Sequence, residues 1–270
     1  MSPCYFSLKG VKLWGRTYEK RSFPISLIRK TYVSRLIGRC LILLGCIWLV
    51  TEDSDQLRTL TDEGFFHSFS LLHLLWAFWV FDMISQLFPI GRRIALGSRK
   101  VFANAFRAAE HRAPIEQLKA YTRASGRKAL LVFLVWSALI AVLGRLHTGK
   151  ILSDAALFLI SVIFYVCDLI CVLVWWPFRL MLGNRCCTTC RIFNWDHIMM
   201  FSPMLFLDSF FARSLNFMAV LAFLGWELTV LLHPERFSSQ TNAALRCTNC
   251  TDKLCTQYCE KGRRAAVKIP

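Results

Sequence analysis

The chain has 270 residues, which suits one large domain or two small ones, but its composition fits neither kind of soluble protein. Hydrophobic residues make up 55% of the chain, above the roughly 45–50% of soluble domains, and charged residues make up only 19%. This hydrophobicity excludes a disordered chain, and the long apolar runs exclude an ordinary nucleic-acid-binding domain despite a net charge of +16. The composition therefore predicts an all-α integral membrane protein with basic loops.

The apolar runs predict about six transmembrane helices, because roughly 20 apolar residues cross a bilayer. Four runs are the clearest candidates: 65–90, 129–146, 155–182 and 215–232. The run 36–50 is shorter and contains Arg39, whose charge can snorkel to the lipid head groups from one end. The run 198–212 is about 15 residues long and contains Pro203. It is either a sixth span or a re-entrant or interfacial segment, which would leave five spans.

The distribution of charge predicts the orientation of these spans. Residues 1–35 hold eight Lys and Arg against one acid, and residues 91–128 hold ten against two, whereas residues 52–63 hold five acids against one Arg. The positive-inside rule places the basic segments in the cytoplasm. The tail 234–270 is also basic, with seven Lys and Arg against three acids, which favours an even number of crossings before it. We therefore expect six spans in the plasma (inner) membrane, with both termini cytoplasmic.

This topology divides the chain into a basic cytoplasmic segment 1–35, a polytopic membrane domain 36–233 and a cytoplasmic tail 234–270. The membrane domain contains two cytoplasmic loops, a basic loop 91–128 and a cysteine-rich loop 183–197. Within the first loop, the pattern of 98–112 predicts an amphipathic helix whose cations bind anionic lipid head groups. Its apolar face consists of Val101, Phe102, Ala105, Phe106 and Ala109. Pro114 is expected to start the next helix.

Seven of the twelve cysteines lie in two polar segments that this topology places on the same face of the membrane. They are Cys186, Cys187, Cys190, Cys247, Cys250, Cys255 and Cys259. A C-x-x-C pair forms half of a metal site, because both sulfurs can face one ion from a tight turn. The pairs Cys187/Cys190 and Cys247/Cys250 would complete a tetrahedral zinc site, and Cys186, Cys255, Cys259 and His197 could hold a second metal. The sequence thus predicts a small cytoplasmic metal clasp.

Zinc is the favoured occupant of this clasp, but two other interpretations stay open. The same thiolates could hold an iron–sulfur cluster, although neither segment has the ferredoxin-type C-x-x-C-x-x-C run with a following Pro. They could also be redox-active thiols or disulfides, because C-x-x-C pairs exchange disulfides. The other five cysteines are expected to be small apolar packing residues.

Four acidic residues fall within or beside the apolar runs and are candidates for function, because charge is costly inside a membrane. Asp82, Asp168 and Glu227 lie inside the runs, and Asp208 lies near the outer end of 198–212. Such carboxylates could relay protons or bind a coupling cation. They could equally accept hydrogen bonds from neighbouring helices or pair with Arg179 or Arg213.

The sequence contains no P-loop, no G-x-G-x-x-G, no G-x-S-x-G and no H-E-x-x-H, so classical kinase, dehydrogenase and hydrolase interpretations have no support. Whether the chain is an enzyme stays open, and the residues favour a non-enzymatic protein. The first hypothesis is a scaffold, regulator or transporter component with a cytoplasmic metal clasp and a protein partner on that face. The alternatives are a membrane oxidoreductase and an ion-coupled small transporter. Nucleic-acid binding is not expected, because a membrane surface explains the basic charge.

Overall fold

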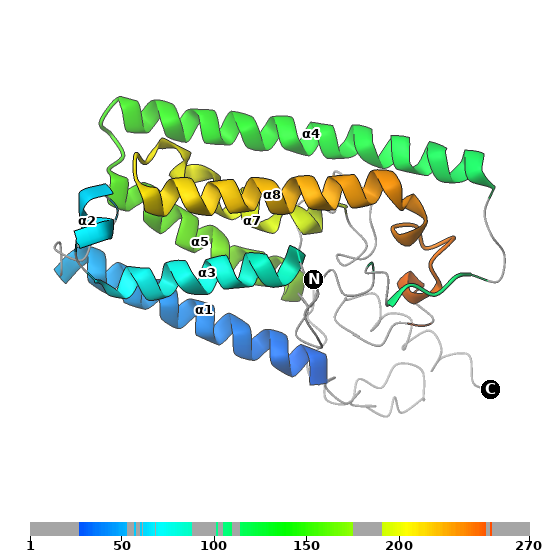
Figure 1. Cartoon of the computed structure of the whole chain (residues 1–270), viewed down its shortest axis with the longest axis horizontal. Coiled ribbons are helices and arrows are strands. Elements are labelled where there is room, and N and C mark those ends of the chain that lie inside the picture. The colour runs from blue at the N-terminus through cyan, green and yellow to red at the C-terminus, as the bar shows by residue number, and fades with distance from the viewer. Residues whose placement is uncertain are drawn as a thin grey trace, which may run out of the picture.

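The computed structural model describes residues 27–52, 57, 60, 62–67, 69–87, 101, 105–109, 114–174, 191–246 and 249 (Figure 1). Its long helices are α1 (Leu27–Glu52), α3 (Leu71–Leu87), α4 (Ile115–Thr148), α5 (Asp154–Leu173) and α8 (Phe210–Leu232). Its short elements are α2 (Asp62–His67), η5 (Arg191–Trp195), α7 (Asp196–Phe201), η6 (Ser202–Phe206), η7 (Pro234–Arg236) and η8 (Ala243–Leu245). The predicted all-helical architecture is confirmed for the described residues.

The long helices lie side by side with their axes roughly aligned (Figure 1). Helices α1 and α4 run in one direction, and α3, α5 and α8 run in the other. Helix α1 packs on α5, α3 packs on α8, and α7 contacts both α5 and α8. The largest core gathers around the fully buried rings of Trp79, Phe158, Phe201 and Phe211. Residues from α3, α5, α7 and α8 therefore meet in one apolar centre.

Four helices are long and apolar enough to cross a membrane: α1, α4, α5 and α8. Helix α3 is apolar but shorter. Large apolar side chains cover the outer surfaces of these helices, as on α1 (Leu41, Leu44), α4 (Leu134) and α8 (Phe217, Leu224), all more than half exposed. Exposed apolar area on this scale suits lipid rather than water. The described helices are therefore compatible with a membrane protein.

The predicted span 65–90 does not form one helix, because a turn separates α2 from α3. The turn is held by His73, whose Nδ1 accepts the backbone N–H of Ser70 at 3.0 Å. The ring Nε2 of His73 then donates to the carbonyl oxygen of Phe65 at 2.9 Å. The His73 side chain thus hydrogen-bonds to backbone groups on both sides of the break. These groups are satisfied although no helix continues between α2 and α3.

The segment 198–212 also differs from a simple span. Helix α7 ends at Phe201, the 3₁₀ turn η6 follows with Pro203 near its start, and the backbone is extended at Leu207. Proline has no N–H to donate to the preceding turn, so the α-helix stops there. Ser209 then caps α8 by accepting the N–H of Ala212 at 3.2 Å. The described part of the long run 155–182 is α5, which ends at Leu173.

The loop 91–128 was expected to contain two short helices, and its described residues show a different structure. Helix α4 is continuous from Ile115 through the predicted span to Thr148, with Pro114 at its N-cap. The described residues of 98–112 form no α-helix, and Ala108 pairs with Asn242 in an antiparallel bridge. The fully buried Asn242 accepts the N–H of Arg107 at 3.3 Å, so the tail satisfies this backbone in place of a helix.

Helix α4 is attached to the rest of the molecule by a narrow buried stripe that ends at Gly144. A β-carbon at Gly144 would overlap the edge of the Phe206 ring in η6. We expect Gly144→Ala to force α4 and η6 apart and to lower the free energy of unfolding by about 1–3 kcal/mol, the usual cost of overpacking. Unfolding in mixed detergent micelles measures this change.

The matched control is Gly38→Ala in α1, where nothing lies within 4 Å of the added β-carbon. This substitution should leave stability unchanged or slightly higher, because alanine favours helix more than glycine does. Equal losses at both positions would contradict the close approach of α4 to η6.

Candidate functional site

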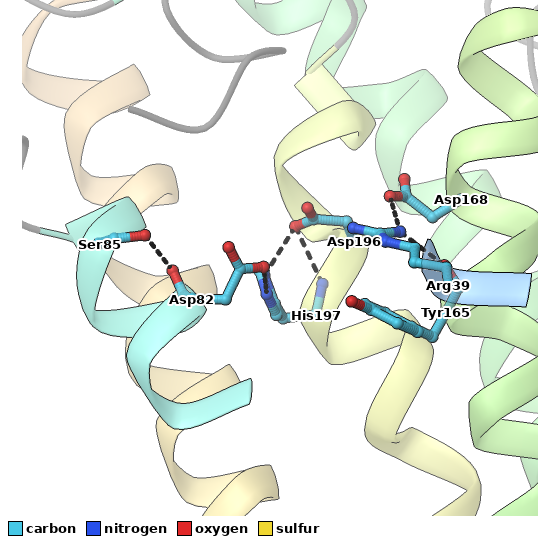
Figure 2. A network of polar contacts seen from close by, with 7 residues as sticks. All are labelled: Arg39, Asp82, Ser85, Tyr165, Asp168, Asp196 and His197. Carbon is cyan, nitrogen blue, oxygen red and sulfur yellow. Dashed lines mark hydrogen bonds and ion pairs between the residues drawn. The ribbon is translucent and has the colours of Figure 1, made fainter. Parts of the chain in front are cut away.

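A cluster of charged side chains lies where α1, α3, α5 and α7 meet (Figure 2). Arg39 comes from α1, Asp82 from α3, Asp168 from α5, and Asp196 and His197 from the start of α7. Every one of these side chains is less than one third exposed. Buried charge is costly unless it is paired, so the geometry of the pairs determines what the cluster does.

The first pair joins α1 to α5. Arg39 Nη1 donates to Asp168 Oδ2 at 2.8 Å, and both side chains are 12% exposed. The same nitrogen donates to the backbone carbonyl of Tyr165 at 2.5 Å, and the guanidinium carbon lies 3.9 Å from the centre of the Tyr165 ring. Tyr165 and Asp168 are three residues apart, which places them on one face of α5. Arg39 is therefore held by a carboxylate, a carbonyl and an aromatic face together.

The second group is centred on the imidazole of His197, which is 3% exposed. Its Nε2 lies 3.3 Å from Asp82 Oδ2, and its Nδ1 lies 3.2 Å from Asp196 Oδ1. The backbone N–H of His197 also donates to Asp196 Oδ1 at 2.9 Å. A carboxylate oxygen can only accept, so a ring with a carboxylate at each nitrogen carries a proton on both. The arrangement therefore suits the imidazolium cation.

The electrostatics of His197 agree with this geometry. The carboxylates of Asp82 and Asp196 lie at opposite nitrogens of the almost fully buried ring, so they compensate the charge of an imidazolium there. The ring is thus positively charged at neutral pH. The cluster holds two cations and three carboxylates within the meeting point of four helices.

A separate ion pair lies between η5 and α8. Arg191 Nε donates to Glu227 Oε1 at 3.0 Å, and Arg191 Nη2 pairs with the other carboxylate oxygen. The indole N–H of Trp195 donates to Glu227 Oε1 at 2.8 Å. A bidentate arginine with an added indole donor fixes the carboxylate of Glu227 firmly. This contact attaches the start of η5 to the second half of α8.

The four predicted carboxylates thus have different surroundings. Asp82 and Asp168 lie in one cluster, Glu227 lies in the η5–α8 pair, and Asp208 is 92% exposed beside Arg213 at 3.0 Å. The expected pairing with Arg213 applies to Asp208, and Arg179 lies outside the described residues. Asp208 therefore has no part in the buried cluster.

Two residues of this site were not singled out in the sequence, and two were given other roles. Asp196 and Tyr165 were not singled out, whereas Arg39 was expected at the head groups and His197 was expected to bind metal. The available signal was the opposite charge of Arg39 and Asp168 in two apolar runs, since two charges inside a bundle tend to pair.

The predicted metal clasp concerns residues outside the described part of the chain. Cys186, Cys187, Cys190, Cys247, Cys250, Cys255 and Cys259 all lie there. Within the described ranges, no group of three or more His, Cys, Asp or Glu side chains could hold a metal ion. Both ring nitrogens of His197, the remaining predicted ligand, face carboxylates in the structure, so a clasp would have to use the cysteines without His197.

The Arg39–Asp168 pair can be tested by substitution. We expect Arg39→Met or Asp168→Leu alone to lower the free energy of unfolding by roughly 3–5 kcal/mol, because each leaves one buried charge without its partner. The double variant should lose much less than the sum of the two. Asp208→Asn serves as the control, because removing an exposed pair changes stability by at most about 1 kcal/mol. Additive losses in the double variant would contradict direct pairing.

Comparison of the chain with protein-family models, with curated proteins and with solved structures found no match.

Proposed function

We propose that the chain is a six-span membrane protein that carries a cysteine-bound metal ion at its cytoplasmic end. In this proposal the five long helices and the segment η5–α7–η6 make the six passes. The two termini, the loop 91–128 and the loop 183–197 lie in the cytoplasm of a plasma (inner) membrane. The protein acts as a scaffold, regulator or transporter component, with a protein partner on the cytoplasmic face.

The direction of the helices supports this topology. Helices α1 and α4 run opposite to α3, α5 and α8 (Figure 1), so the described ends that border 1–26, 88–114 and 175–190 lie at the same end of the bundle. The first two of these segments are strongly basic. The positive-inside rule places basic segments on the cytoplasmic side, so this end of the bundle is the proposed cytoplasmic end.

One observation carries the metal proposal: the described residues beside both cysteine-rich segments pack on the same part of α8. On one side, Arg191 directly follows Cys190 in the chain and pairs with Glu227. This bidentate pair holds the start of η5 against α8. The first described residue after this cysteine-rich segment is therefore attached beside Glu227.

On the other side, the tail after α8 folds back on the same helix. Phe237 and Leu245 pack in one cluster with Trp226 and Val230 of α8. The backbone N–H of Ala243 also donates to the carbonyl oxygen of Arg107 at 2.7 Å, which fixes this stretch from its other side. Arg246, the last described residue before Cys247, therefore follows a segment that is packed around residues 226–230.

The described residues that border the two cysteine-rich segments thus pack on the same part of α8, although more than 50 residues separate these segments in the sequence. Thiolates that start from a common anchor can meet around one ion at a small cost in chain entropy. Four thiolates in two C-x-x-C pairs suit tetrahedral zinc, and seven leave enough for a second metal. An iron–sulfur cluster or redox-active thiols would use the same residues and would make the protein an oxidoreductase.

A basic surface on the first part of α4, at the proposed cytoplasmic end, favours contact with anionic lipid head groups. Lys119, Arg123 and Arg127 are exposed and lie four residues apart along the first part of α4. This spacing places them on one stripe of the helix. In the proposed topology the stripe lies close to the cytoplasmic leaflet, where anionic head groups attract cations.

Metal analysis of anaerobically purified full-length protein tests the clasp. We expect colourless protein that contains zinc, with metal content falling by at least half in both Cys190→Ser and Cys250→Ser, because each removes one ligand of a shared site. Brown protein with bound iron would support the oxidoreductase alternative instead. The control Cys40→Ser lies in α1 and should keep the full metal content.

The shared site would be contradicted by full metal occupancy in either Cys190→Ser or Cys250→Ser. Protein without metal in the wild type would reject the clasp altogether. Comparable melting temperatures of Cys40→Ser and the wild type exclude general misfolding caused by cysteine substitution.

A further inference from the structure

We propose that His197, Asp82 and Asp196 form a buried proton-binding site whose occupancy controls the contact between α3 and α7. The ligand is a proton, and the site makes a movement of α3 depend on proton uptake and release. This inference rests on the described side chains alone and is independent of the metal proposal. It supplies a proton-coupled step to a protein that crosses the membrane.

The two carboxylates that contact His197 lie on different helices. Only one of the two contacts can therefore break when α3 and α7 separate. Asp196 is the preceding residue in α7, so its contact with Nδ1 stays whatever the other helices do. Asp82 belongs to α3 and is 115 residues away along the chain. The contact of Nε2 with Asp82 is therefore the one that joins two separate elements.

The proton on Nε2 determines whether this joining contact attracts or repels. With the proton present, Nε2 donates to Asp82 Oδ2 across 3.3 Å, and an imidazolium faces a carboxylate. On release, the proton passes from Nε2 to water, and the lone pair left on Nε2 faces the lone pairs of the Asp82 oxygen. The charge of the cluster becomes more negative by one unit. Both changes favour separation of α3 from α7.

Asp82 also gives the proton a path to water. Its side chain is 29% exposed, against 3% for His197 and 14% for Asp196. A carboxylate that contacts both the buried ring and the outside can pass a proton between them. Exchange with the solvent therefore does not require the whole cluster to open.

The other charged or ionisable groups near His197 do not account for the gain and loss of this proton. Arg39 stays charged and is paired with Asp168, and arginine does not lose its proton in proteins. Tyr165 contacts Arg39 through its ring and its carbonyl oxygen. On α8, which also packs on α7, Glu227 is paired with Arg191. His197 is thus the group of the cluster that gains and loses a proton.

The observed position of α3 leaves one buried hydrogen-bond donor unsatisfied. The Asp82–His197 contact offsets the free-energy cost of this donor. Trp79 lies one turn before Asp82, and its ring packs among Tyr165, Phe201 and Phe211. Its buried indole N–H has no hydrogen-bond partner in the part of the chain that the structure describes. A buried donor without an acceptor destabilises the arrangement that contains it. The Asp82 contact therefore helps to stabilise a position of α3 that leaves this donor unsatisfied.

Helix α3 is attached to α8 near both of its ends. The indole of Trp76 donates to Ser214 of α8 at 2.8 Å, and the side chain of Leu87 lies close to Gly225 of α8. Asp82 lies between these two contacts. Release of the Asp82 contact therefore loosens the side of α3 that faces α7, while α3 stays on α8.

Stability should follow the protonation of His197. A carboxylate at each ring nitrogen favours the doubly protonated ring. The site therefore stabilises the docked position of α3 while His197 holds both protons, and this contribution is lost as the pH rises and one proton leaves.

Nuclear magnetic resonance of full-length protein in lipid nanodiscs, labelled with ¹⁵N at histidine, tests the proton site. His197 is assigned by the signal lost in His197→Gln. We expect His197 to stay doubly protonated beyond pH 8, where ordinary histidines are neutral. Asp82→Asn should shift the titration of His197 to lower pH, and Asp208→Asn should leave it in place. Titration of His197 near pH 6.5, or an unchanged titration in Asp82→Asn, would overturn the proposal.

Hydrogen–deuterium exchange at pH 7 tests the movement of α3. In Asp82→Asn and in His197→Gln we expect exchange in peptides from 80–87 to rise roughly ten-fold, the factor set by one lost charge-assisted hydrogen bond. Peptides from α5 and α8 should exchange at the rates seen in Asp208→Asn. An equal rise in α3, α5 and α8 would show that the cluster only holds the fold together and would overturn the coupling. Unchanged exchange in 80–87 would overturn it as well.

Discussion

The requirement that buried charge be paired constrains this structure more than any other interaction. Arg39 and Asp168 lie on α1 and α5, two helices whose remaining surfaces are largely apolar. Neither charge is stable alone in such surroundings, so the pair fixes the depth and rotation of α1 against α5. Apolar contacts permit many sliding arrangements of two helices, whereas an ion pair permits few. The cluster around His197 applies the same constraint to α3 and α7.

Helix α8 organises the other half of the molecule. One face of α8 packs on α3 and α7 in the aromatic core, and its second half receives η5 through Glu227 and the tail through Trp226 and Val230. The loop residues 105–109 join the tail through Asn242. A single long helix thus connects the buried charged cluster to the end of the molecule where we propose the metal clasp. Movement of α3 on α8 and metal binding at its end would involve the same helix.

The sequence predicted the helices and the charged residues inside them. It did not predict which residues these charges pair with. The apolar runs predicted α1, α4, α5 and α8, and the doubt raised by Pro203 was justified, since α7 stops just before it. Asp82, Asp168 and Glu227 were recognised because a charge in an apolar run is conspicuous. Their partners were not, because pairing across helices depends on tertiary contacts: Arg39 is 129 residues from Asp168. The described residues 101 and 105–109 lack the helix expected at 98–112 for the same reason, because Asn242 lies 135 residues beyond Arg107.

Carboxyl footprinting tests the central claim most directly, namely that the charged cluster is buried and paired inside the helix bundle. Full-length protein in nanodiscs would be treated at pH 7 with a water-soluble carbodiimide and an amine, and each acidic residue would be followed by mass spectrometry. The account predicts rapid modification of Asp208, which is 92% exposed, and strong protection of Asp168 and Asp196, which are 12% and 14% exposed. Modification of Asp168 and Asp196 as fast as Asp208 would contradict it.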